Sequence, residues 1–163
     1  KKDIENLVLL IAPRYADRSS RLADMAQNMG LSNKLRSDNS SVQNDVVILD
    51  TIGELTLAYA LADVVFVGGS FTKRHGQNIV EPASCAKPVL FGPNMDNFSD
   101  AVQLLLGRGG IQVSNGQQLK EVLQKLLGNA SEMEQLGTMA RKNILHLKGV
   151  AKKNAERIAA INT

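Results

Sequence analysis

Residues 63 to 93 of the chain read DVVFVGGSFTKRHGQNIVEPASCAKPVLFGP, and this stretch decides the fold. Residues 64 to 67 form a short apolar run, which is typical of a parallel strand that helices cover on both faces. Gly68 and Gly69 follow this run and let a ligand approach the backbone closely. Asn78 and Glu81 then lie three residues apart at a predicted helix start. The stretch therefore predicts a strand, a glycine-containing loop and a helix.

Two interpretations of this stretch are open from its residues alone. The carboxylate of Glu81 can accept hydrogen bonds from two vicinal hydroxyls, as a ribose offers, and the free N–H groups of a helix start can hold a phosphate. The same residues also suit a tight turn into a capped helix that binds nothing. The rest of the chain has to decide between them.

The composition is that of a soluble globular protein. The chain has 163 residues, of which 44% are hydrophobic and 21% charged, and its formal net charge is +3. This length suits one domain rather than two. No apolar run approaches the ~20 residues of a membrane-spanning helix, and no segment resembles a signal peptide. We expect one soluble domain over residues 1 to 163.

The residue inventory disfavours several kinds of site. His75, His146 and Cys85 are the only histidines and the only cysteine, and neither HExxH nor CxxC occurs, so we expect no metal site. The patterns GxxxxGK[ST] and GxGxxG are absent, which disfavours a P-loop NTPase and an ordinary dinucleotide fold. With no Trp, two Tyr and four Phe, the chain also lacks the rings that stack on single-stranded nucleic acid.

Apolar runs and helical patterns alternate along the chain. Strands are predicted over residues 6–12, 35–41, 45–50, 62–67, 88–91 and 111–113, and helices over residues 18–29, 54–62, 79–85, 98–106, 117–127, 131–147 and 152–161. Ser131 and Glu134 have the spacing of a capping box for the helix that begins there. Strands that alternate with helices predict an α/β fold with a doubly wound, mostly parallel sheet.

Ligands of such sheets bind at the carboxyl ends of the strands. We expect the loops after residues 12, 50, 67 and 91 to share that edge of the sheet. The loops contain Arg14, then Ile52, Gly53 and Glu54 at a helix start, then Gly68, Gly69 and Ser70. A guanidinium offers bidentate donors to a phosphate, and a helix start favours an anion. Each feature alone is an ordinary loop or cap, but their convergence favours a site for a phosphorylated ligand.

Two segments resemble a known family. Residues 50 to 98, DTIGELTLAYALADVVFVGGSFTKRHGQNIVEPASCAKPVLFGPNMDNF, are similar to the C-terminal half of the 3-deoxy-D-manno-octulosonic acid (Kdo) transferases of lipopolysaccharide synthesis. Residues 12 to 18, APRYADR, resemble the Pro-Arg-His loop of that family. The resemblance covers the chain from Leu7 to about Arg141. It is specific because DT-x-GEL, FVGGS, Asn-x-x-Glu-Pro and PVLFGP occur together in this order.

The resemblance implies a Rossmann-like donor domain of a GT-B glycosyltransferase, which transfers Kdo from CMP-Kdo to a lipid A precursor with inversion at the anomeric carbon. It implies that Arg14 and the turn of Ile52, Gly53 and Glu54 contact the CMP phosphate and base. It further assigns the phosphate to Asn78, the ribose to Glu81, and the sugar side to Gly68, Gly69 and Ser70. CMP-Kdo is then a substrate, and no cofactor is expected.

The family's general base, its acceptor domain and its membrane anchor lie in the N-terminal half, so the resemblance implies that this chain lacks them and is inactive by itself. It implies a location at the cytoplasmic face of the bacterial inner membrane, with no nucleic-acid partner. An anionic membrane surface is one partner for the basic residues near the end, although a solvated helix face is the favoured explanation for them: Lys142, Lys148, Lys152, Lys153 and Arg157.

Two positions depart from the family pattern. Tyr15 stands where the family usually has His, and His75-Gly76-Gln77-Asn78 stands where it usually has Gly-Gly-His-Asn. Two other functions therefore stay open. One is the donor domain of another GT-B glycosyltransferase that uses a UDP- or GDP-sugar, and the other is a non-catalytic nucleotide-binding module.

Overall fold

The computed structural model describes residue 4 and residues 6–38 and 42–161, with side chains described as far as residue 145. The chain divides into two compact units, Lys1–Ala58 and Tyr59–Thr163, and the boundary falls within α2 (Leu55–Leu61). Both units combine a parallel sheet with helices, so the predicted α/β class is confirmed. The strands form two three-stranded sheets, one in each unit.

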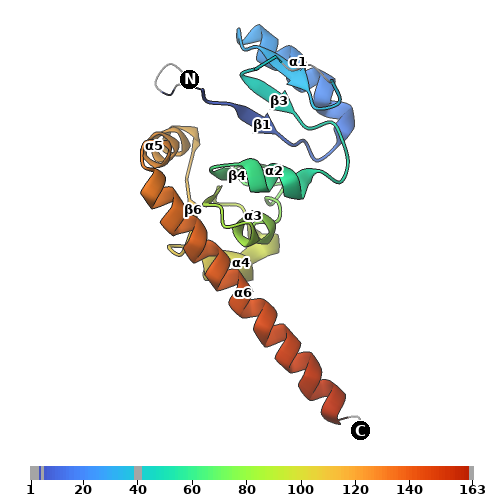
Figure 1. The fold of residues 1–163 in the computed structure, drawn as a ribbon, viewed down its shortest axis with the longest axis vertical. Coiled ribbons are helices and arrows are strands. Elements are labelled where there is room, and N and C mark those ends of the chain that lie inside the picture. Colours follow the sequence, from blue (N-terminus) through green and yellow to red (C-terminus); the bar gives the residue numbers. More distant parts are fainter. Residues whose placement is uncertain (1–3, 5, 39–41, 162–163) are drawn as a thin grey trace. The chain divides into compact units, whose positions relative to one another are not determined.

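The first unit is built on a sheet of order β1-β3-β2. Its strands are β1 (Leu9–Ile11), β2 (Asn33–Leu35) and β3 (Val46–Ile48), and a short 3-10 turn, η1 (Ala16–Arg18), leads into α1 (Ser19–Asn28). Figure 1 shows α1 beside this sheet, and its Ala26 is buried against Val46 and Ile48 of the central strand. Gly30 ends the helix region with φ +72°, the left-handed geometry in which glycine avoids steric cost.

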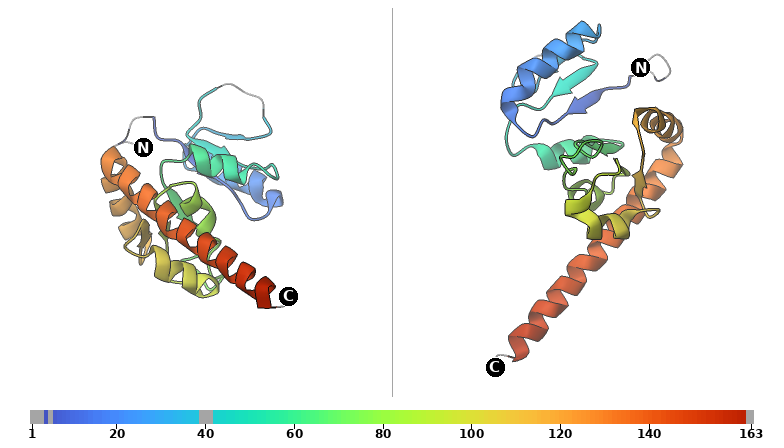
Figure 2. Two further views of the ribbon diagram at one scale, coloured as in Figure 1. Left: turned by 60° about the horizontal axis from the view of Figure 1, so that its bottom comes forward. Right: turned by 180° about the vertical axis from the view of Figure 1, so that it is seen from behind.

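The second unit has a sheet of order β4-β5-β6. It contains β4 (Val65–Val67), α3 (Val80–Ser84), β5 (Val89–Phe91), η2 (Asp96–Phe98), α4 (Ser99–Leu105), β6 (Gly110–Gln112), α5 (Gly116–Leu127) and α6 (Ala130–Ile161). All three residues of β5 are buried, because this central strand is covered on both faces. The helices α3, α4 and α5 all contact α6, which the views of Figure 2 show as one continuous helix.

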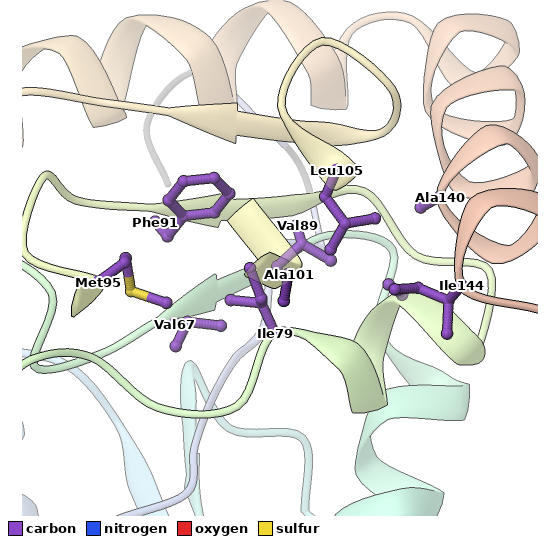
Figure 3. Packing of buried hydrophobic residues seen from close by; sticks show 10 residues of the cluster. Val67, Ile79, Val89, Phe91, Met95, Ala101, Leu105, Ala140 and Ile144 are labelled. Carbon is purple, nitrogen blue, oxygen red and sulfur yellow. The ribbon is translucent and has the colours of Figure 1, made fainter. Parts of the chain in front are cut away.

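The core of the second unit joins the sheet to α6. Figure 3 shows Phe91 and Val89 of β5 in one cluster with Ile144 and Ala140 of α6. Gly137 lets α6 pack closely against the turn that follows α3, because a Cβ at position 137 would overlap the carbonyl oxygen of Ala86. The central strand and the long helix therefore form one packed body that carries the loops at the sheet edge.

The predicted strands overlap those observed, but the second was misplaced. It was expected over residues 35–41, whereas β2 covers Asn33–Leu35. The chain turns directly after β2, where the Leu35 amide donates to the Asp38 carboxylate at 3.3 Å. Residues 39–41 lie outside the described residues. The expected strand was therefore wrong over residues 36–38, where a hydrogen-bonded turn replaces it.

The last two predicted helices form a single helix, α6, so the predicted break between residues 147 and 152 is wrong. Its capping box is also two residues earlier than predicted. The Glu132 amide donates to Asn129 Oδ1 at 3.1 Å, and Asn129 Nδ2 donates to the Glu132 carboxylate at 3.2 Å. Lys142 is exposed, and the side chains of Lys148, Lys152, Lys153 and Arg157 lie outside the described ones. Across the described part of the chain, no helix combines the length and apolar character needed to cross a bilayer.

Candidate functional site

The loops that carry the predicted site residues follow neighbouring parallel strands within each unit. In the first unit β1 pairs with β3, so the loops after residues 12 and 50 lie at one edge of that sheet. In the second unit β4 pairs with β5, which places the loops after residues 67 and 91 at one edge of the other sheet. The expected clustering is confirmed within each unit, and the grouping of all four loops stays a prediction.

Arg14 belongs to an exposed cluster of two guanidinium groups around one aromatic ring. The Cζ atom of Arg14 lies 5.7 Å from the centroid of the Tyr15 ring, and that of Arg18 lies 5.2 Å from the same centroid. Both distances are within the range of a cation–π interaction. Both cations therefore lie around one ring, and their positive charge favours anion binding at the end of β1.

Glu54 is held from two sides at the end of β3. The Thr51 hydroxyl donates to one carboxylate oxygen of Glu54, and Arg36 Nη2 lies 3.0 Å from the other. In the sequence between Thr51 and Glu54, Ile52 is 96% exposed and Gly53 adopts φ +90°. The predicted turn is therefore a projecting loop whose acidic residue is already neutralised by Arg36, so it repels an anion less.

Asp50 joins this turn to the end of β2. Its carboxylate accepts from the Ser37 hydroxyl at 2.5 Å and from the Ser37 amide at 3.0 Å. These hydrogen bonds, that of the hydroxyl first, lower the pKa of Asp50 below its ordinary value of 3.8. The ionised carboxylate of Asp50 thus fixes the direction in which the chain leaves β3.

In the second unit Gly68 and Gly69 are exposed at the end of β4, whereas Ser70 is completely buried. Gly69 has φ +80°, and its Cβ position faces the backbone of Gly76 at 3.7 Å. The Ser70 hydroxyl donates to the Val67 carbonyl at 2.6 Å and accepts from the Gly92 amide at 2.8 Å. The Ser70 hydroxyl is thus occupied inside the protein, and the prediction that this residue lines the sugar side stays a prediction.

The loop after β4 is tied to the loop after β5 at three places. Ser70 is the first, because its carbonyl also accepts from the amide and the side chain of Asn94, at 2.9 and 3.1 Å. Gly76 is the second, since a Cβ there would overlap the sulfur of Met95. The third is His75, whose Nδ1 lies 2.5 Å from Asp96 Oδ2. These contacts hold the loop after β4 and the loop after β5 together at the edge of the sheet.

Asn78 and Glu81 lie at the start of α3, as predicted. Asn78 Oδ1 accepts from the Val80 amide at 2.9 Å, and its Nδ2 donates to Glu81 Oε1 at 2.9 Å. Asn78 therefore bonds the first residue of α3 in an Asx-type turn, and it also orients the carboxylate of Glu81. Glu81 is exposed and keeps its second oxygen for a ligand hydroxyl.

Tyr59 adds a phenol near this carboxylate. Burial raises the pKa of Tyr59 above 10.0, and the negative charges of Glu81 and Cys85 raise it further. The raised pKa of Tyr59 thus includes an electrostatic interaction with the Glu81 carboxylate. A neutral, half-buried phenol beside a carboxylate suits a polar ligand group better than a second anion would.

One surface hollow, of about 550 Å³, lies along α6 and is lined by Ser131, Glu134, Gln135, Thr138, Met139 and Lys142. It contains none of the predicted site residues. Among the described residues, no group of three or more His, Cys, Asp or Glu side chains is placed to hold a metal ion.

Known proteins resemble the chain in sequence and in structure. The 3-deoxy-D-manno-octulosonic acid transferase of Rickettsia bellii is 31% identical over 139 residues, which are 82% of this chain and 33% of the relative. The crystal structure of the C-terminal CMP-Kdo binding domain of WaaA from Acinetobacter baumannii matches with a TM-score of 0.78 and 32% identity, over 85% of this chain and 74% of that one. The chain belongs to the Kdo transferase family.

Other comparisons agree with this membership. The Kdo transferase of Bordetella pertussis is 38% identical over 105 residues, which are 63% of this chain and 24% of the relative. No protein-family model matches. The chain spans about a third of the length of the curated Kdo transferases that it matches. The family membership expected from the motifs is thereby confirmed.

In this member of the Kdo transferase family, sequence reasoning missed three charged or polar residues at the sheet edges. Asn94 and Asp96 follow β5, so the rule that ligands bind at strand ends could have found them. Arg36 follows β2, and the misplaced strand concealed it. The partners of Arg36 and Asp96 depend on strand register, which no local pattern shows.

Proposed function

We propose that this chain is the donor-binding domain of a Kdo transferase and that it binds CMP-Kdo. The observation that carries the proposal is the match to the CMP-Kdo binding domain of WaaA, with a TM-score of 0.78 at 32% identity. The match extends over most of both chains, so it concerns the whole fold and not one motif.

In the proposed complex, Arg14 and the turn of Ile52, Gly53 and Glu54 contact the phosphate and base of CMP. What supports this role is the pair of guanidinium groups at Tyr15 and the neutralisation of Glu54 by Arg36. Positive charge at the end of β1 favours the phosphate electrostatically.

We assign the ribose to Glu81 and the phosphate to Asn78, with Gly68, Gly69 and Ser70 on the sugar side. Asn78 already holds one oxygen of Glu81, which leaves the other to accept from a ribose hydroxyl. The exposed pair Gly68 and Gly69 offers backbone without side chains, so a ligand can come close. The buried hydrogen bonds of the Ser70 hydroxyl to the Val67 carbonyl and the Gly92 amide hold this backbone in place.

For the whole enzyme we propose direct displacement. An acceptor hydroxyl of a lipid A precursor attacks the anomeric carbon of Kdo, the bond from that carbon to the phosphate oxygen breaks, and CMP leaves with the electron pair. The hydroxyl proton passes to a carboxylate base, which we place in the part of a full-length Kdo transferase that this chain does not cover. The residues of this chain stabilise the charge on the leaving phosphate, so no cofactor is required. We further propose that transfer occurs at the cytoplasmic face of the inner membrane, where the anionic lipid surface is the partner.

A thermal-shift series with CMP, UDP and GDP tests the proposed function. A ligand that binds only the folded chain stabilises it by about 2.7 kcal/mol when its concentration is a hundred times Kd. We expect CMP to raise the melting temperature more than UDP or GDP at equal concentration. Equal or greater protection by UDP or GDP would instead identify another class of donor, and no protection by any of the three would contradict nucleotide binding.

A further inference from the structure

We propose that the contact between the His75 imidazole and the Asp96 carboxylate is a positioning device that holds the glycine loop, residues 68 to 79, in its ligand-binding conformation. The inference rests on the proposed function for the identity of the ligand. It concerns a histidine and an aspartate that the proposed binding mode leaves without a role.

The backbone at His75 needs a partner to hold it. His75 has φ +59°, and Gly76 follows with φ +55°, so two successive residues are left-handed. This conformation is unfavourable for a residue with a Cβ, and glycine alone adopts it freely. Such a conformation persists at a non-glycine residue only when its surroundings impose it.

Asp96 supplies the contact that imposes it. Its Oδ2 lies 2.5 Å from His75 Nδ1, and the residue begins η2 directly beyond the loop that leaves β5. Charge-assisted hydrogen bonds of this kind are stronger than neutral ones. The adjacent Met95 is almost completely buried in the core, so the Asp96 backbone is firmly placed. The strained end of the glycine loop is thereby tied to the rigid central strand.

The pair lies at the end of the loop where Gly76 also packs against Met95 and the His75 amide donates to the Thr72 carbonyl at 3.4 Å. Ser70, at the beginning of the loop, is buried and bonded to Gly92 and Asn94 without any charge. The His75 and Asp96 side chains are 44% and 73% exposed, and the exposed cations Lys73 and Arg74 precede the histidine. Loss of the pair therefore removes the side-chain tie at this end and loosens it, while the beginning stays bound through Ser70.

A looser backbone at His75 would directly affect the residues that we propose to contact the ligand. Gln77 and Asn78 follow directly after the two left-handed residues, and Asn78 orients the carboxylate of Glu81. A change of backbone at His75 turns the direction in which Asn78 enters α3. The pair accordingly acts on the ligand through Asn78 and makes no contact with it.

The test is a cycle of variants of the 163-residue chain with CMP as the probe in calorimetric titrations. We expect Asp96→Asn to weaken CMP binding by about five- to thirtyfold, the factor that the cost of one left-handed residue gives. In the background of His75→Gly, which accepts this backbone without an anchor, the same change should alter Kd by less than about twofold. An equal effect in both backgrounds, or none in either, would overturn the proposal. Asp100→Asn, on the exposed face of α4, is the control for the change in net charge.

Two measurements on the free chain separate the failure of this inference from that of the proposed function. Asp96→Asn should speed amide hydrogen exchange at Gly76, Gln77 and Asn78, and should change the imidazole ¹⁵N shifts of His75 as Nδ1 loses its partner. If CMP does not bind the unmodified chain, the proposed function is wrong, and these two readouts still decide the role of the pair. Unchanged exchange and unchanged ¹⁵N shifts would overturn it.

Discussion

The change Ser70→Ala tests the claim that one buried hydroxyl joins the two loops of the second sheet. Ser70 is completely buried, donates to the Val67 carbonyl at 2.6 Å and accepts from the Gly92 amide at 2.8 Å. Alanine makes neither bond, and each buried polar group left without a partner costs about 1–3 kcal/mol. We expect a loss of about 2–4 kcal/mol for the two groups together.

The loss should lower the melting temperature by about 5–15 °C, because about 2–4 °C correspond to each kcal/mol in a chain of this size. Urea unfolding followed by far-ultraviolet circular dichroism measures the global effect. Hydrogen exchange at residues 65–67 and 89–92 measures the local effect, which matters because the chain has two compact units.

Ser84→Ala is the matched control for this change. The Ser84 hydroxyl donates to the Glu81 carbonyl at 2.7 Å in a partly exposed position, where water can replace it. Its substitution should cost no more than about 0.5 kcal/mol, the usual limit for a surface change. If Ser70→Ala costs no more than Ser84→Ala, the two loops are not joined through this hydroxyl and the reasoning is refuted.

Three further predictions concern the site and its supports. Glu81→Gln should weaken CMP binding about tenfold in a calorimetric titration, because a hydrogen bond to a charged group contributes about 1.5–3 kcal/mol; an unchanged Kd would remove the ribose assignment. Gly76→Ala should destabilise the chain by more than about 1 kcal/mol in urea, since an added Cβ meets a packed side chain at φ +55°, whereas Gly116→Ala, with no atom within 4 Å, should not. Because the folded chain lowers the pKa of Asp50, the ionised carboxylate stabilises the fold above pH 3.8, the unfolded value, and this contribution disappears as the pH falls through the folded value. Ser37→Ala removes the largest cause of the lowered pKa, so the urea midpoint of this variant should change less with pH between about pH 2 and 5. An identical pH profile in both proteins would contradict the last prediction.

The parts of the fold that follow from sequence are those with a strong local signal. The strands β3, β4 and β5 are VVI, VFV and VLF, apolar runs that are typical of a parallel sheet covered by helices. The strand β2 is NKL, which carries no such run, and it was misplaced. In α6 the glycine at position 149 suggests a break, but one glycine costs a helix only about 1 kcal/mol.

The candidate site was predictable at its strand ends and helix start but not in its side-chain pairs. Asn78 and Glu81 are three residues apart, so a helix start alone brings them together. The pairs Arg36–Glu54 and His75–Asp96 join residues 18 and 21 positions apart. Which side chains meet over such separations depends on strand register and on the turns between strands, and single-sequence patterns do not contain that information.

The most direct test of the central claim, that this chain binds the nucleotide of CMP-Kdo at the ends of its strands, is an NMR titration of the ¹⁵N-labelled chain with CMP. We expect saturable shifts of the amides of Gly68, Gly69 and residues 76 to 81 at the edge of the second sheet, and of Arg14 and Gly53 in the first unit. Shifts confined to the hollow along α6, or no saturable shifts anywhere, would contradict it.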